Sequence, residues 1–74
     1  MVSEDDPRPV YVQLAALLRA RIASGEIRSR LPSERDIQQE FGIAPMTTRK
    51  AVRLLKEAGE VVTVPGRGTF VKRD

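Results

Sequence analysis

"LPSERDIQQEFGIAPMTTRKAVRLLKEAGEVVTVPGRGTFV", residues 31–71, is the stretch that decides the fold of this chain. It contains two segments of helical periodicity joined by about three residues, "GIA", and it ends in two short β-type runs around "PGRG". Two helices at this spacing are typical of a helix-turn-helix, and the proline and glycines between β-branched runs predict a tight hairpin. The hairpin has an arginine at its tip, where a side chain buries little and adds little to a core.

The first helix of this stretch has clear boundary signals. Ser33 is placed at the N-cap and Asp36 follows three residues later, a capping-box pattern in which Asp is shorter than the usual Glu or Gln. Leu31 can pack on Ile37 across the helix start, and Gly42 suits the helix end.

The second helix of the stretch is expected to begin near Pro45, which suits the first helical position, and to close at Gly59. One side of it has small and apolar residues: Thr48, Ala51, Val52, Leu55 and Ala58. The other side has a basic stripe: Arg49, Arg53 and Lys56. The pattern predicts that the first side is buried and that the basic stripe faces solvent or a partner.

A further helix precedes this stretch. Its apolar positions recur at helical spacing: Val10, Leu14, Leu17, Leu18 and Ile22. Pro9 suits its first turn and Gly25 its exit, whereas residues 1–8 are charged and aperiodic and predict a flexible N-terminal arm. The expected fold class is therefore α+β: one winged helix-turn-helix domain, residues 9–74, with three helices followed by a two-stranded β-hairpin wing.

The residue types that are missing argue against an enzyme or a metal site. The 74 residues include no histidine and no cysteine, so the commonest general base and the commonest zinc ligands are absent. The sequence has no phosphate-binding glycine loop before a helix, and a nucleophile at Ser33 would lack a base. We expect no catalytic residue, no metal and no cofactor.

The formal net charge of +3 conceals a segregation of charge. Four of the ten acidic residues lie at the two ends of the chain, and the remaining body has 13 basic and 6 acidic residues, so its net charge is 13 − 6 = +7. Such a body favours a polyanionic partner, with nucleic acid ahead of an anionic membrane. No apolar leader or membrane-length apolar run is present, so we expect a cytoplasmic protein that binds no membrane.

A helix-turn-helix presents its second helix to the major groove of DNA, with residues near the helix N-terminus at the base edges. The candidates on this helix are Met46, Thr47, Arg49, Lys50 and Arg53. Arginine can bond both acceptors of guanine, and threonine can bond a phosphate or contact a thymine methyl group. The alternative is an ordinary solvated helix face on which Arg53 pairs with Glu57.

The hairpin tip supplies a second group of candidates. Arg67 lies between Gly66 and Gly68, an arrangement that suits the narrow and strongly negative minor groove. The alternative is that the two glycines only provide the positive φ that the turn needs.

The start of the first helix of the helix-turn-helix supplies a third group of candidate DNA contacts. Ser33 and Arg35 lie at a helix N-terminus, a position that favours phosphate. Ser33 is first of all a helix cap, and Arg35 could instead bond Glu40 or Asp36.

In this order, the motifs resemble the winged-helix DNA-binding domain of GntR-type bacterial transcription regulators. The resemblance covers about residues 9–72, through "PVYVQLAALLRARIASGEI", "LPSERDIQQEFGI", "MTTRKAVRLLKEAGEVV" and "PGRGTFV". It implies a regulator, a repressor rather than an activator, that binds a pseudo-palindromic operator in double-stranded DNA as a dimer. It also implies that the following residues contact bases, phosphates or the minor groove: Arg35, Thr47, Arg49, Gly66, Arg67 and Gly68.

Three features depart from the family pattern. Ala44 and Pro45 stand where Ser or Thr followed by Arg is usual, which removes a side-chain cap and one expected DNA contact. The link "GEIRSRLPS" is shorter than is usual in the family. The sequence ends at Asp74, just after the wing, whereas family members commonly have an effector-binding and dimerising domain, so the chain is either a stand-alone module or a piece of a larger protein without its sensor domain. We therefore expect relaxed specificity or modest affinity, no small-molecule effector bound by this chain, and a homodimer only on DNA.

The function expected from the sequence is occupancy of an operator, with the third helix in the major groove and the wing in the minor groove, by a protein associated with the nucleoid. The alternative from another class is a winged-helix module that docks on a protein or on RNA. Such a module would bind DNA weakly and without salt dependence, and Arg49 and Arg67 would be dispensable for its partner.

Overall fold

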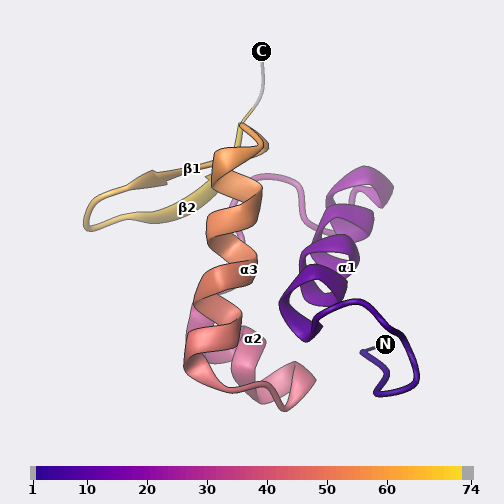
Figure 1. The fold of residues 1–74 in the computed structure, drawn as a ribbon. Coiled ribbons are helices and arrows are strands. Elements are labelled where there is room, and N and C mark those ends of the chain that lie inside the picture. Colours follow the sequence, from indigo (N-terminus) through magenta and orange to yellow (C-terminus); the bar gives the residue numbers. More distant parts are fainter. Residues whose placement is uncertain (1, 73–74) are drawn as a thin grey trace.

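The structure, a computed structural model, describes residues 2–72. Three helices come first, α1 (Val10–Ser24), α2 (Glu34–Phe41) and α3 (Pro45–Glu57), and an antiparallel hairpin follows, β1 (Val61–Val64) and β2 (Gly68–Val71). Figure 1 shows α3 between α1 and the hairpin, with α2 behind the first turns of α3. The hairpin projects from the helical body as a wing. The predicted order of three helices and a two-stranded wing is confirmed.

The two helices of the helix-turn-helix have the boundaries that the sequence predicts. Ser33 is the N-cap of α2, and its Oγ accepts a hydrogen bond from the backbone N–H of Asp36 at 3.1 Å. Gly42 follows α2 with φ 64°, a left-handed conformation that suits glycine. Ala44 is the N-cap of α3 and provides no side-chain hydrogen bond, while Pro45 occupies the first helical position. The loss of a side-chain cap that the sequence predicts for this helix is therefore confirmed.

Gly59 closes α3 as the sequence predicts, and the last helical residue lies two positions before it. The helix ends at Glu57, and the N–H groups of Gly59 and Glu60 donate to the carbonyls of Lys56 and Leu55 at 2.9 and 3.0 Å. This pair of bonds is a Schellman motif, with Gly59 in the left-handed conformation that the motif needs. Ala58 was expected on the buried side of the helix, but it is exposed because it lies in this turn.

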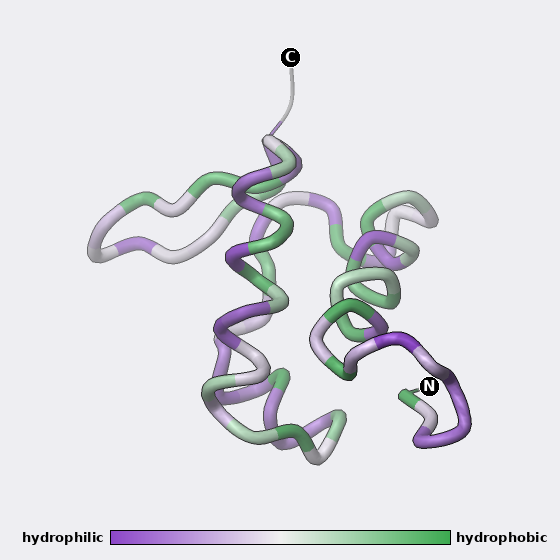
Figure 2. The backbone as a smooth tube through the Cα atoms, in the orientation of Figure 1, coloured by the Kyte–Doolittle hydropathy of each residue, from purple (hydrophilic) through white to green (hydrophobic). Residues whose placement is uncertain are grey.

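The hydrophobic core lies between α1 and α3 and extends to α2 and to the base of the wing. Its buried members are Leu14, Ala15, Leu18, Ile27, Leu31, Ile37, Ala51, Val52, Leu55 and Val61. Thr48 is also fully buried, and its Oγ1 donates to the carbonyl of Ala44 at 3.1 Å, so its hydroxyl is satisfied. In Figure 2 the tube of α3 is hydrophilic on the side of the wing and more hydrophobic towards α1. The core thus holds one face of α3 and leaves the other free.

α1 departs from the predicted apolar face at its first turns. Val10 is 39% exposed, and Pro9 is the N-cap rather than a first-turn residue. Gln13, which the apolar pattern did not include, is 4% exposed. Its side chain accepts from the N–H of Ser3 at 2.8 Å and donates to the carbonyls of Ser3 and Arg8 at 3.1 and 2.9 Å. The segment that was expected to be a flexible arm is therefore hydrogen-bonded to α1 in its described part.

A third β segment, which the sequence did not predict, attaches the wing to the body. The N–H of Leu31 donates to the carbonyl of Thr69 at 2.8 Å, and the N–H of Val71 donates to the carbonyl of Ser29 at 2.6 Å. Residues 29–31 therefore pair with β2 on the side opposite β1. The pairing fixes the wing relative to the N-terminus of α2, only a few residues further along the chain.

Candidate nucleic-acid interface

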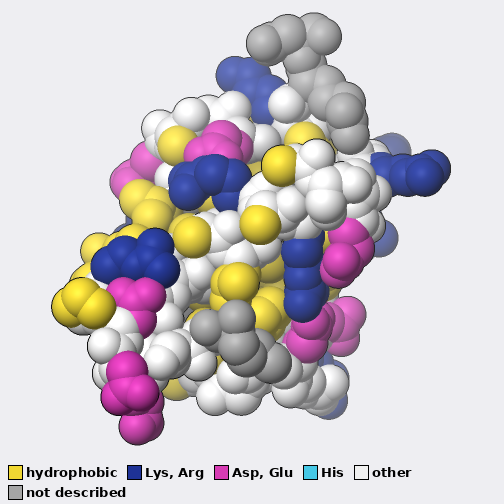
Figure 3. All heavy atoms as spheres, turned by 90° about the vertical axis from the view of Figure 1, so that its right-hand side faces the viewer, with side chains coloured by type: hydrophobic (Ala, Val, Ile, Leu, Met, Phe, Trp, Pro, Cys, Tyr) yellow, Lys and Arg dark blue, Asp and Glu magenta, His cyan; other side chains and the backbone are white. Residues whose placement is uncertain are grey.

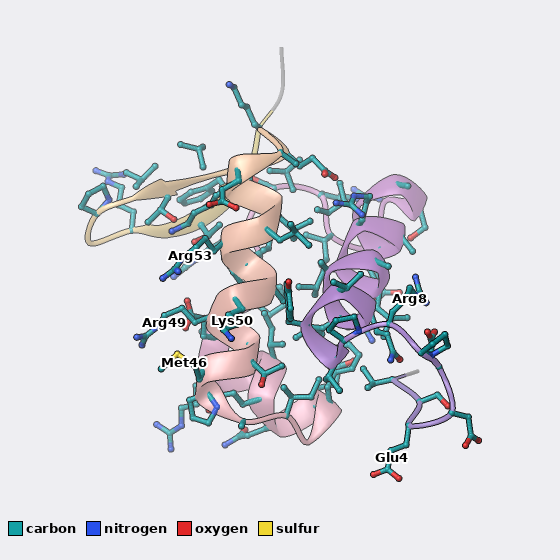
Figure 4. The ribbon with its side chains drawn as sticks, in the orientation of Figure 1. Glu4, Arg8, Met46, Arg49, Lys50 and Arg53 are labelled. Carbon is teal, nitrogen blue, oxygen red and sulfur yellow. The ribbon has the colours of Figure 1, made fainter. Side chains whose placement is uncertain are left out.

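The exposed face of α3 has most of the predicted site. Met46, Arg49 and Arg53 extend from α3 towards the side on which the wing projects (Figure 4). Met46 is 63% exposed although it is apolar, so most of its surface is open to solvent or to a partner. One turn of helix separates each of these side chains from the next, and together they form a strip along α3 beside the wing.

Two further predicted residues of α3 lie at the border of this strip. Lys50 faces α1, and its Nζ lies 5.9 Å from the centre of the Tyr11 ring, a cation–π distance. Thr47 is half-buried in the first turn of α3. The structure therefore brings Met46, Arg49 and Arg53 together, whereas Lys50 lies towards Tyr11 of α1 and Thr47 is half-buried.

Arg49 has one weak partner. Its Nε lies 3.7 Å from Oε1 of Glu34 in the first turn of α2, and the two side chains are 61% and 40% exposed. An exposed pair at this distance contributes about 0–1 kcal/mol, so the guanidinium can exchange the carboxylate for another acceptor at little cost.

Arg35 and Arg53 have no acidic partner among residues 2–72. In the described part of the chain no carboxylate oxygen lies within 4.0 Å of either guanidinium, so the alternative pairs with Asp36 and Glu57 do not form. Glu40, the other acid considered for Arg35, bonds Arg21 instead. Both arginines are exposed, so α2 and α3 each present an uncompensated cation.

The tight hairpin that the sequence predicts has a three-residue turn at the wing tip. Residues 65–67 form it, and the N–H of Arg67 donates to the carbonyl of Val64 at 2.9 Å. Gly66 and Gly68 have φ of 75° and 125°. Both glycines therefore provide the positive φ that the turn needs, which is the alternative to a minor-groove contact that the sequence leaves open. Arg67 is exposed, and no carboxylate among residues 2–72 lies within 4.0 Å of it.

Three arginines of the N-terminal segment and of α1 are paired, in contrast to Arg53 of the strip and Arg67 of the wing tip. The pairs are Arg8 with Asp6 at 2.7 Å, Arg19 with Glu60 at 2.7 Å, and Arg21 with Glu40 and with Glu26. The hydrogen bonds from Arg19 and Arg21 lower the pKa of Glu60 and of Glu40, respectively. Figure 3 looks at the α1 side of the molecule and shows basic and acidic side chains next to one another. Unbalanced positive charge thus gathers on the other side, along α3 and the wing.

A groove connects the predicted residues at the start of α2 with the wing. It has a volume of about 310 Å³ and is lined by residues 30–34, by Val52 of α3 and by residues 68–69 of β2. Ser33 therefore lies on its wall, close to the N-terminal amides of α2. Arg30, which the sequence pattern did not single out, lines the groove on the side of the wing.

Residues 2–72 offer no sign of other chemistry. No three His, Cys, Asp or Glu side chains of this part of the chain gather in a way that could hold a metal ion. No helix within it has the length and hydropathy of a membrane span.

Comparison with known proteins agrees with this geometry. The family model described as "Bacterial regulatory proteins, gntR family" matches residues 10–71. The chain belongs to this family. It is 38% identical over 74 residues to the HTH-type transcriptional repressor NagR of Bacillus subtilis (strain 168), an alignment that covers 97% of this chain and 30% of NagR. It is 39% identical over 69 residues to the mannosyl-D-glycerate transport/metabolism system repressor MngR of Escherichia coli (strain K12), covering 90% of this chain and 29% of MngR.

A solved relative shows the same fold. The crystal structure of AraR(DBD) in complex with operator ORX1 superposes with a TM-score of 0.83 and 35% identity, over 95% of this chain and 86% of that one. The winged helix-turn-helix that the sequence predicts is therefore confirmed. The chain spans about 30% of the length of the two curated relatives.

Proposed function

We propose that this chain binds an operator in double-stranded DNA and represses transcription by occupying it. The observation that supports the proposal best is the arrangement of uncompensated cations: Arg35, Arg53 and Arg67 lack acidic partners within residues 2–72, whereas the α1 side is neutralised by ion pairs. Solved DNA complexes of the same fold at 35% and 31% identity give independent support.

In this proposal α3 lies in the major groove. Arg49 and Arg53 reach base edges or phosphates, Met46 contacts the groove floor, and Thr47 and Lys50 contact the backbone. Pro45 offers no donor where the family usually has arginine, so we expect discrimination between sequences to be modest.

The remaining contacts fix the register of the domain on the duplex. Arg35 and the N-terminal amides of α2, capped by Ser33, bind phosphate, because helix N-termini favour anions. The turn of Gly66, Arg67 and Gly68 enters the adjacent minor groove, where an arginine meets concentrated negative potential. Two copies on a pseudo-palindromic site would place two such interfaces on one duplex, and the proposal locates the protein at the nucleoid. Neither a small-molecule effector nor catalysis is part of the role of this chain.

A genomic binding selection with the purified chain tests the proposal, followed by affinities of the enriched fragments at two salt concentrations. The expected result is enrichment of an inverted repeat that binds more tightly than random duplex, with an affinity that falls steeply as salt rises. Uniform, weak and salt-insensitive binding to random fragments would reject the proposal and favour a winged-helix module that docks on a protein or on RNA.

A further inference from the structure

Arg30 is held at the base of the wing by its backbone. It lies opposite Phe70 in the bridge between the third β segment and β2, and the hydrogen bonds of its two neighbours, Ser29 and Leu31, fix this register. Phe70 in turn lies opposite Val62 of β1. Because directly opposite residues in a sheet share a face, Arg30 extends from the same face as these two side chains.

The side chain of Arg30 lies over Gly68, two residues before Phe70 on β2. Its Nε and Nη2 are only 2.9 and 3.3 Å from the place that a Cβ on Gly68 would occupy. A guanidinium can therefore lie there only because residue 68 has no side chain. Among residues 2–72, Gly68 is the only one of the five glycines with positive φ for which an atom of a residue other than its chain neighbours lies within 4 Å of that place. Because Gly68 has no side chain, a space remains beside it, and the guanidinium of Arg30 fills this space.

The charge of Arg30 is not compensated by any acidic residue that the structure describes. The side chain is exposed, and among the described residues no carboxylate oxygen lies within 4.0 Å of it, although the groove beside it contains Glu34. The guanidinium lies between the N-terminus of α2 and the strand that leaves the wing tip. A cation at this point lies beside the path that a DNA backbone follows if the tip enters the minor groove and α3 the major groove.

We propose that Arg30 binds a DNA phosphate at the edge of the minor groove, and that Gly68 serves this contact by leaving the space in which the guanidinium lies. The inference rests on the proposed function and adds a residue and a mechanism to it. It gives Gly68 a role through Arg30, in addition to the φ of 125° that any other residue at this position would find strained. The contact is to phosphate, so it strengthens binding to every sequence alike.

The first test replaces Arg30 by glutamine, which keeps much of the aliphatic stem and removes the charge. Arg30→Gln is expected to reduce the slope of log affinity against log salt by about one unit per bound chain, on operator and random duplex equally. The loss of DNA affinity caused by Arg30→Gln is therefore expected to be roughly threefold smaller at about 0.2 M salt than at about 0.05 M salt. Arg30→Lys, which retains a charge, is expected to keep most of the slope. Lys72→Ala is the matched control. It removes an exposed positive charge just after the end of β2, at the opposite end of that strand from the wing tip.

The outcomes separate this inference from the proposed function. If the unmodified chain shows no salt-dependent DNA binding, the proposed function fails. If the unmodified chain binds with a steep slope and Arg30→Gln has the same slope, or if Lys72→Ala lowers the slope as much, only the role of Arg30 is overturned. Thermal unfolding of each variant shows whether a lost contact reflects a lost fold.

A double-mutant cycle tests the role of Gly68. Gly68→Ala is expected to weaken DNA binding severalfold in the unmodified chain, because the methyl group displaces the guanidinium. The same change on the Arg30→Gln background is expected to weaken binding less, since no cation remains to be displaced. Equal losses on both backgrounds would show that Gly68 acts through its backbone alone, and would overturn its proposed role.

Discussion

The Nε of Arg49 lies 3.7 Å from the Oε1 of Glu34, so the arginine that we propose to read a base already faces an acid of the neighbouring helix. DNA must compete with this carboxylate, which also repels phosphates near the start of α2. Glu34→Gln is therefore expected to raise affinity for operator and random duplex alike, by up to about fivefold, the equivalent of about 1 kcal/mol. Dissociation constants measured at low salt check this. Glu4→Gln, an equal change of charge on the described N-terminal segment, is the control, and an equal gain there would assign the effect to net charge.

Arg49 itself is expected to read one base position. Arg49→Ala should cost about 1–3 kcal/mol of binding free energy and relax the preference at that position, because a bidentate arginine distinguishes guanine from the other bases. Arg49→Lys retains the charge but loses the fork of donors, so it should retain affinity better than it retains preference. The measurement is a set of affinities on operators that differ at single positions. Uniform weakening on all of them would make Arg49 a phosphate contact.

The helix-turn-helix could be predicted because its signals are local. Ser33, Gly42 and Pro45 act on residues within one helical turn, so their roles as cap, terminator and first helical residue follow from spacing alone. The hairpin is equally local, since a proline and two glycines set the turn between two β-branched runs. The candidate residues on α3 and the wing followed from this geometry.

The remaining features could not be predicted because they depend on residues distant in sequence. Residues 29–31 pair with a strand about 40 residues away and show no alternating pattern of their own. Gln13 would be expected on the surface, but backbone groups of Ser3 and Arg8 satisfy it in the interior. The contact of Arg49 with Glu34, and the space over Gly68 that Arg30 fills, exist only after the helices and the wing have packed.

The wing tip is expected to contribute the charge of Arg67 to DNA binding and little to the stability of the fold. The turn around Arg67 is closed by a backbone bond to Val64, so Arg67→Ala should leave the hairpin intact. Loss of the guanidinium should weaken binding and lower the salt slope by roughly one unit, because one phosphate-directed cation is removed. The slope is measured from affinities over a range of salt concentrations, with unfolding temperature as the check on the fold. A slope equal to that of the unmodified chain would show that the tip is free of DNA.

The missing cap of α3 offers a test of stability. Ala44 has the extended conformation of an N-cap, with φ −63° and ψ 151°, but provides no acceptor for the first amides of the helix. Ala44→Ser is expected to raise the free energy of unfolding by about 0.5–2 kcal/mol. For a domain of this size that corresponds to a rise in Tm of several degrees, which thermal unfolding can detect. Ala58→Ser, at the exposed C-cap of the same helix, should give no such gain. An unchanged Tm for Ala44→Ser would mean that Pro45 and solvent already satisfy the helix start.

The bond between Arg19 and Glu60 predicts a loss of stability in acid. Arg19 Nε lies 2.7 Å from Glu60 Oε1, and this bond lowers the pKa of Glu60 below its usual 4.5. A lowered pKa in the folded state means that the unfolded chain binds the proton more readily, so the contribution is present above about pH 4.5 and is lost as the pH falls through the folded pKa. Glu60→Gln should therefore be less stable than the unmodified chain near neutral pH, by no more than about 1 kcal/mol, and equally stable in strong acid. Denaturant unfolding at a series of pH values measures the difference. The stability of Arg19→Gln should likewise approach that of the unmodified chain in strong acid. A difference in the free energy of unfolding that persisted at low pH would show that the side chains contribute by packing rather than by charge.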